Sequence, residues 1–171
     1  MQLYIEEMEE LHDTKGMERS KWLGLLARAS LDRLEEVLES YTHLKHDILK
    51  PFETVAYMVQ ARTGSTGQRF NVGEVSVGRM VIKLHLPTLE DPQRSYVGVA
   101  YVKGASEHQT YLTALADALL QESSHHKILL KALLEPISTS LKREQETMNQ
   151  KVQATRVEFF TVARENNASS V

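Results

Sequence analysis

Hydrophobic positions follow two different spacings along the chain, and the helical spacing comes first. Apolar residues between Trp22 and Ala29 predict a short helix, and Ser30 is a suitable N-cap for a second one. In the second helix, spacings of three and four give one apolar face, formed by Leu31, Leu34, Val37, Leu38 and Tyr41. The chain therefore opens with two amphipathic helices.

Extended segments follow Pro51. The stretch ETVAYMVQAR, residues 53–62, is rich in β-branched and aromatic residues, as strands commonly are. Residues 70–86 and the stretch YVGVAYVKG, residues 96–104, show the same extended character. Three consecutive strands joined by turns favour an antiparallel sheet.

In the second of these strands, the apolar residues switch from one set of alternating positions to the other. Val77 belongs to one alternating set of apolar positions and Met80 to the other. An extra residue in one strand of a pair shifts the alternation in this way, so the pattern predicts a β-bulge near Gly78 and Arg79. Such a bulge would turn Arg79 toward the preceding hairpin.

Helical spacing returns after the strands. Ser106 and Gln109 form a capping-box pattern at the start of a helix. Its apolar stripe comprises Leu112, Leu115, Ala116, Leu119 and Leu120. We expect this helix to cover the sheet, because its stripe is as wide as a core-facing helix requires.

A last helix is predicted over residues 137–164, with Pro136 in its first turn. It would extend about 42 Å at about 1.5 Å per residue, which exceeds the length of a small sheet. Its apolar seam is narrow and surrounded by charge. Part of the helix should therefore dock on a partner subunit or form a hairpin with the preceding helix. The candidates for a partner interface are Met148, Val152, Phe159 and Phe160.

These elements predict an α+β fold, in which an antiparallel sheet is flanked by two N-terminal helices and two long C-terminal helices. We expect a single domain over residues 17–171. Residues 1–16 carry five acidic side chains and one lysine, a net charge of -4. They are either an extension outside the fold or an ordinary solvated segment.

Composition narrows the classes of function. The chain has 171 residues, 42% hydrophobic and 25% charged, which is typical of a globular domain rather than a disordered or fibrous protein. The net charge of -3 gives no general attraction to nucleic acid or anionic lipid. Because cysteine is absent, disulfides, thiolate metal sites, cysteine nucleophiles and iron–sulfur ligation by this chain are excluded. No signal-peptide pattern or membrane-length apolar run is present, so the expected location is cytoplasmic, without a membrane partner.

The glycine-containing loop between the first two strands is the most suggestive polar feature. Its sequence lacks the nucleotide-binding P-loop pattern, and it joins strand to strand rather than strand to helix. Arginine side chains that converge there could clamp a phosphate or carboxylate in bidentate fashion. The candidates for an anion site are Arg62, Thr66, Arg69 and Arg79. The alternative is a plain solvated hairpin.

The histidines give no specific motif. His43 and His46 are three residues apart and could share a metal, but surface histidines near a helix end account for them equally simply. Glu107 and His108 lie in a first helical turn, where solvated residues are common. The sequence predicts neither a metal site nor a particular catalytic residue.

Three segments together resemble a known family. They are QARTGSTGQRFNVGEVSVGR (60–79), VAYVKGASEHQTYLTALADALLQ (99–121) and VQATRVEFFTVARE (152–165). In this order and at these separations they resemble the PhnG subunit of bacterial carbon–phosphorus lyase, and MERSKWLGLLARAS (17–30) resembles the start of that family. The positions that match its pattern are Arg62, Gly64, Thr66, Gly67, Arg69, Phe70, Gly73, Arg79, Gly104 and Asp117.

The resemblance implies a subunit of a complex that degrades organic phosphonates under phosphate scarcity. In that family PhnG acts with PhnI, PhnH and PhnL, and the core complex also contains PhnJ. The implied reaction displaces adenine from ATP and attaches an alkylphosphonate to the ribose, giving ribose 1-alkylphosphonate 5-triphosphate. The nucleosidase activity is attributed to PhnI, so the resemblance implies no catalytic residue here. It implies no cofactor bound by this chain, with ATP as a substrate of the complex.

Overall fold

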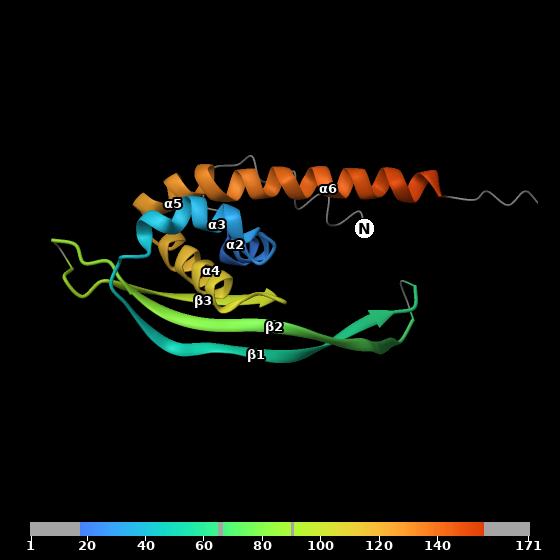
Figure 1. The fold of residues 1–171 in the computed structure, drawn as a ribbon, viewed down its shortest axis with the longest axis horizontal. Helices are drawn as coiled ribbons and strands as arrows, with labels where there is room; N and C mark the ends of the chain where they lie inside the picture. Colours follow the sequence, from blue (N-terminus) through green and yellow to red (C-terminus); the bar gives the residue numbers. More distant parts are fainter. Residues whose placement is uncertain (1–17, 65–66, 90, 156–171) are drawn as a thin grey trace, which may run out of the picture. The chain divides into compact units, whose positions relative to one another are not determined.

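The computed structural model describes residues 18–64, 67–89 and 91–155. Its elements run in the order α2 (Arg19–Leu26), α3 (Leu31–Leu38), the 3-10 turn η2 (Glu39–Tyr41), β1 (His46–Arg62), β2 (Arg69–His85), β3 (Ser95–Lys103), α4 (Glu107–Leu120), α5 (Ser123–Leu129), the π-helical segment η3 (Leu130–Leu134) and α6 (Glu135–Ala154) (Figure 1). The predicted α+β class is confirmed. No helix within the described ranges is both long and apolar enough to cross a membrane.

The three strands form an antiparallel sheet in the order β1-β2-β3. β1 begins at His46 and runs through Pro51, so the prediction that a strand starts only after this proline was wrong. Proline is tolerated because β1 is an edge strand and its pairing with β2 is irregular between Lys50 and Glu53. β3 pairs with β2 only over residues 77–85 of β2.

β2 has no extra residue at Gly78 and Arg79, because its register with β3 is regular from Val77 to His85. The irregularity near Arg79 lies on β1 instead, between Lys50 and Glu53. On β2, alternate residues from Gly78 to Leu84 are buried toward the helices, while Val75 and Val77 lie on the opposite face. Apolar residues of β2 therefore lie on both faces of the sheet. This explains why the apolar positions switch from one alternating set to the other. A real irregularity leaves Val72 unpaired between Gly73 and Asn71.

Helix α4 lies between the sheet and the other helices of its unit. It packs on β3 and β2 on one side and contacts α2, α3 and α5 on the other (Figure 1). Consequently every residue from Leu112 to Leu120 is buried, not only the predicted stripe. The predicted cap is confirmed, because the backbone N–H of Gln109 donates to Ser106 Oγ at 3.2 Å.

The N-terminal helices close the core over α4. Trp22, Leu26, Leu34 and Leu38 are buried there. The Gln109 side chain donates to the Ala29 carbonyl at 3.1 Å, and Arg33 donates to the carbonyl of Ala132 in the π-helical segment. These bonds tie the turn after α2, and α3, to elements about a hundred residues later in the chain.

The chain divides into two compact units, one ending at Ser138 and the other beginning at Thr139. All described buried apolar side chains belong to the first unit, the last being Ile137. α6 begins at Glu135, so Pro136 lies in its first turn as predicted. Every described residue from Glu146 to Thr155 is exposed.

Candidate functional site

The candidate anion site lies at the tip of the β1–β2 hairpin. Arg62 and Arg69 are the last pair of residues in the β1–β2 register and stand directly opposite each other. Side chains of directly opposed residues lie on the same face of a sheet, about 5 Å apart at Cβ. Both arginines are exposed, and neither forms an ion pair with another described residue. The spacing argument was right about their proximity, while anion binding stays a prediction.

The loop that joins the two arginines turns tightly. Gly64 has φ 66°, a left-handed conformation that favours glycine. A Cβ at Gly67 would collide with the backbone carbonyl of Thr63, so the chain also passes itself closely there. The candidate Thr66 lies outside the described residues.

Arg79 does not join this site. It pairs with Glu53 in the register and lies ten residues after Arg69 on β2, or about 33 Å along the strand at about 3.3 Å per residue. Glu53 accepts from Arg79 and also binds Lys50 Nζ at 2.9 Å. The hydrogen bond to Glu53 raises the pKa of Arg79, so this arginine stays charged and is held in an ion pair. The expectation that Arg79 turns toward the hairpin loop was wrong, because Arg79 donates to Glu53 and the irregularity beside it lies on β1 rather than on its own strand.

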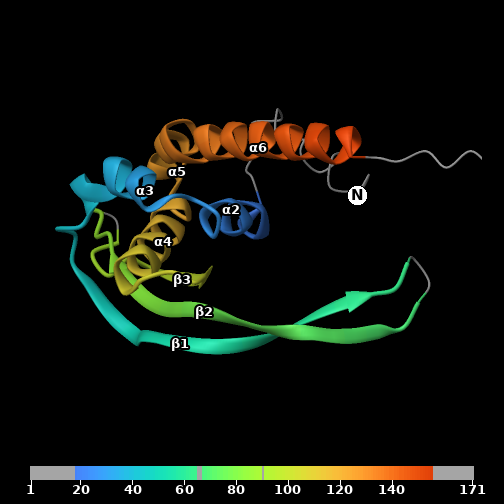
Figure 2. The ribbon, with the colours of Figure 1, turned by 45° about the vertical axis from the view of Figure 1, so that its right-hand side comes forward.

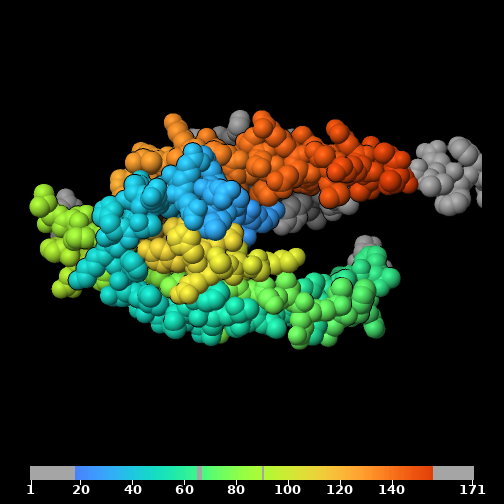
Figure 3. All heavy atoms as spheres, in the orientation of Figure 1, coloured from blue at the N-terminus to red at the C-terminus, as the bar shows by residue number. Residues whose placement is uncertain are grey.

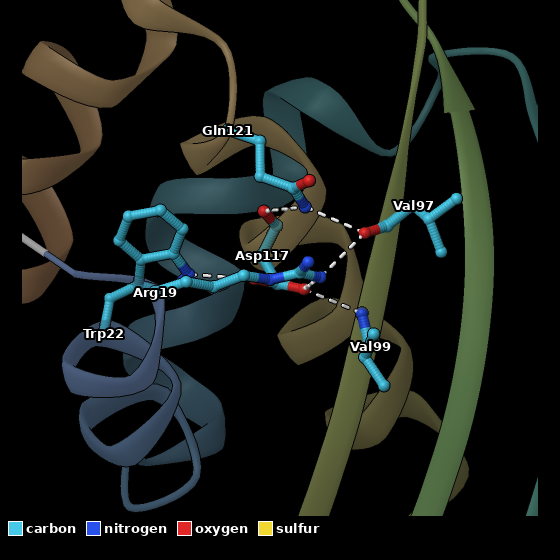
Figure 4. A network of polar contacts seen from close by, with 6 residues as sticks. All are labelled: Arg19, Trp22, Val97, Val99, Asp117 and Gln121. Atoms are coloured by element: carbon cyan, nitrogen blue, oxygen red, sulfur yellow. Dashed lines mark hydrogen bonds and ion pairs between the residues drawn. The ribbon is translucent and has the colours of Figure 1, made fainter.

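Asp117 is the centre of a polar network that the sequence did not reveal (Figure 4). Its carboxylate is fully buried and accepts from Arg19 Nη2 at 2.6 Å and Trp22 Nε1 at 2.8 Å. It also accepts from the Val99 backbone N–H at 2.9 Å. Arg19 Nη2 donates further to the Val97 carbonyl at 2.9 Å. The hydrogen bond that Arg19 donates to Asp117 raises the pKa of Arg19, so this arginine stays charged.

This network fastens α2 and α4 to the free edge of β3. Gln121 Nε2 completes it by donating to the Val97 carbonyl at 2.8 Å. Val97 and Val99 point their backbone polar groups away from β2, and side chains satisfy them in place of a fourth strand. A buried carboxylate that already accepts several hydrogen bonds holds parts of the fold together and is not free to take part in catalysis. The sequence marked Asp117 only as a position that matches the family pattern, without a role.

Two of the histidines considered in the sequence have different neighbours. His46 lies in β1 against the Tyr111 ring, while His108 pairs with Glu35 at 3.0 Å. His125 lies in the first turn of α5, where its Nδ1 is 2.8 Å from Glu122. Among residues 18–64, 67–89 and 91–155, no group of three or more His, Asp or Glu side chains could hold a metal ion.

The partner candidates on the last helix are only partly described. Met148 and Val152 lie in α6, and each is 60% exposed and therefore accessible to a partner. Phe159 and Phe160 lie outside the described residues. Docking of this helix on a partner stays a prediction.

The fold and the site first define a class of protein: an α+β domain with a cationic hairpin tip and, among its described residues, no cluster of side chains that could hold a metal ion. Residues 17–165 match the family model described as "Phosphonate metabolism protein PhnG". The chain is also similar to a Rhizobium meliloti (strain 1021) protein named "Alpha-D-ribose 1-methylphosphonate 5-triphosphate synthase subunit PhnG". The two are 31% identical over 154 residues, which cover 89% of this chain and 92% of that protein. The chain belongs to the PhnG family.

Proposed function

We propose that this chain is a subunit of a synthase complex that forms ribose 1-alkylphosphonate 5-triphosphate from ATP and an alkylphosphonate, releasing adenine. The observation that carries this proposal is the family match over residues 17–165, together with the synthase name of a relative of nearly equal length. Its partners are the other subunits of a carbon–phosphorus lyase complex, PhnI, PhnH, PhnJ and PhnL. The isolated chain is inactive and holds no cofactor, and ATP is a substrate of the whole complex.

Within that complex, the hairpin tip contributes cations to a shared anion site. Two arginines directly opposite each other repel, which costs stability unless an anion lies between or beside them. Guanidinium groups bind phosphate and phosphonate oxygens in bidentate fashion. Arg62 and Arg69, with Thr66 between them in the loop, are the residues that would meet the triphosphate or the phosphonate. Arg79 is left out because it lies ten residues from Arg69 along β2 and is paired with Glu53.

The test is Arg69→Ala, assayed as the assembled complex. Since Arg69 is exposed, the substitution should change the free energy of unfolding by about 0.5 kcal/mol or less. Loss of a charge-assisted bidentate contact should lower kcat/KM for adenine release about 10- to 100-fold, equivalent to about 1.5–3 kcal/mol. The matched control is Lys103→Ala, an exposed cation at the end of β3, which should retain activity.

The rival function is a structural subunit that supports the nucleosidase partner and never touches substrate. The saturation of Asp117 by structural hydrogen bonds favours this alternative, since that buried carboxylate is not available for chemistry. Wild-type kinetics in an assembled Arg69→Ala complex would support the rival and remove the hairpin tip from the substrate site.

A further inference from the structure

Strand β1 has a free outer edge. It is the first strand in the order β1-β2-β3 and pairs with β2 alone (Figure 2). Figure 3 shows the first half of β1 along the border of its unit, below β3 and α4. A free edge presents a row of backbone N–H and C=O groups that can pair with another chain unless the edge is protected.

The hydrogen bonds of β3 show in which direction the backbone groups of β2 point. The Val99 N–H and the Val97 carbonyl bond to helix side chains, so both residues direct these groups away from β2. In an antiparallel pair such residues alternate with residues that bond across the pair. Even-numbered residues of β3 therefore bond to even-numbered residues of β2, as Gly98 does to Ile82. The odd-numbered residues of β2 are left to bond to β1.

The same alternation continues into β1. Residues 53–59 of β1 pair with residues 73–79 of β2 in a regular register, odd positions with odd positions. The Ser76 carbonyl accepts from the Gly104 N–H at 2.9 Å on the β3 side, as this alternation requires. Even-numbered residues of this part of β1 therefore direct their N–H and C=O groups to the free edge. They are Thr54, Ala56 and Met58.

These outward groups are unprotected. No hydrogen bond joins them to another residue that the structure describes. Edge strands are commonly protected by lysine, proline or irregular pairing, and β1 has all three between Lys50 and Glu53. Residues 54–59 contain neither a charge nor a proline, and their register is regular. The edge of β3 is protected by the side chains that bond to Val97 and Val99.

We propose that residues 54–58 of β1 bind an extended strand of another protein subunit, which joins the sheet as a fourth strand. This inference rests on the proposed function, which supplies the multi-subunit complex. The three outward residues offer three N–H donors and three C=O acceptors along about 17 Å, at about 3.4 Å per residue. A second extended backbone complements this row, whereas a helix does not, because its own backbone groups are bonded internally.

A second copy of β1 is a poorer occupant of this edge. A two-fold antiparallel contact centred on Ala56 would place Pro51 of one copy opposite Ala61 of the other, and Lys50 opposite Arg62, at both ends. Proline cannot donate a backbone hydrogen bond, and like charges directly opposite each other destabilise a strand pair. The added strand therefore comes from a different protein. Uncharged side chains suit it, because those of residues 54–59 beside it are uncharged.

The experiment uses Ala56→Pro in the full chain, coexpressed with the other complex subunits from the same genome. The Ala56 N–H points away from β2, so proline removes a donor from the free edge and no hydrogen bond from the sheet. The matched control is Ala56→Thr, which enlarges the same side chain but keeps the N–H. Copurification and native mass spectrometry measure assembly, and thermal unfolding and sedimentation characterise the free chains.

We expect Ala56→Pro to reduce incorporation into the complex at least 10-fold, while Ala56→Thr assembles like wild type and both free chains melt within a few degrees of it. Normal assembly of Ala56→Pro would overturn the inference and leave the proposed function standing. Equal loss of assembly in both variants would also overturn it, because the side chain rather than the N–H would then be recognised. A wild-type chain that joins no complex would overturn both the inference and the proposed function.

Hydrogen exchange resolved to single amides tests the same edge in the wild-type chain, whether or not the proline variant folds. In the free chain the amides of Thr54, Ala56 and Met58 should exchange faster than those of Val55 and Tyr57. In the complex all five should be protected. Outward amides that stay unprotected would overturn the inference. If the free chain dimerises and the dimer protects these amides, the occupant is a second copy and the strand from another protein is wrong.

Discussion

At the residue scale, two buried or half-buried carboxylates stabilise the fold in different ways. Asp117 joins residues that are far apart in the sequence, from Arg19 to Val99. Glu122 acts locally as the N-cap of α5 and accepts from the backbone N–H groups of Ser124 and His125, each at 2.9 Å. Because the Glu122 side chain is 13% exposed, its titration should affect stability measurably.

Glu122 gives a prediction about pH. Burial raises its pKa, but hydrogen bonds from Ser124 and His125 outweigh burial and lower the pKa to about 2. The unfolded value is about 4.3, so the unfolded chain binds more protons between these values and stability rises with pH there. The contribution is fully present above about pH 5 and amounts to at most roughly 3 kcal/mol.

Glu122→Gln should therefore be less stable than wild type near neutral pH. The difference in the free energy of unfolding should shrink as the pH falls from 5 toward 2. Urea unfolding of both proteins across this range measures it. Parallel stability curves for the two proteins would show that the charge of Glu122 contributes nothing to the cap.

At the element scale, the closest approach in the core is between β3 and α4. A Cβ at Gly98 would collide with the backbone carbonyl of Ala114 and lie 2.9 Å from the Ala118 Cβ. The absence of a side chain at Gly98 thus lets α4 approach the sheet and brings Asp117 within reach of the Val99 N–H.

Gly98→Ala should destabilise the fold, because a backbone carbonyl cannot move aside as a flexible side chain can. We expect a loss of about 1–3 kcal/mol, the usual cost of overpacking a core. Thermal or urea unfolding measures this loss. Gly73→Ala is the matched control, since no atom lies within 4 Å of its added Cβ. Equal stability of the two variants would contradict the packing of α4 on β3.

Sequence reasoning at this scale succeeded where the signal was local. The helix at 31–38, the Ser106 cap and the first turn of α6 follow from spacing and capping residues within a few positions. The start of β1 was missed because Pro51 was interpreted as a boundary, although an edge strand tolerates it. Arg79 was misplaced because one sequence cannot show that both faces of a strand are apolar.

At the scale of the whole molecule, the apolar core of the described chain belongs entirely to the unit that ends at Ser138. The exposed stretch from Glu146 to Thr155 contributes no buried side chain. A chain that ends after Gln145 should therefore retain one cooperative thermal transition, with the melting temperature lowered by no more than about 5 °C, or roughly 1–2 kcal/mol.

The same truncated chain tests the last helix as a partner surface. If Met148 and Val152 contact a partner, truncation should weaken assembly even though the domain folds. Differential scanning fluorimetry and copurification separate these two effects. Loss of the cooperative transition would contradict the assignment of the core to the first unit, and full assembly would remove the last helix from the interface.

The sequence by itself determined the order of helices, strands and helices and the pairing of Arg62 with Arg69 across a short loop, because spacing and turn residues act over a few positions. It did not predict α5 or the π-helical segment. The family pattern was also present in the linear chain. Only the tertiary structure decided that Asp117 binds Arg19, Trp22 and Val99. It also decided that Glu53 pairs with Arg79 and that β3 pairs only with residues 77–85 of β2. These outcomes depend on which distant segments meet, and that is set by the packing of α4 between the sheet and the helices rather than by any local stretch.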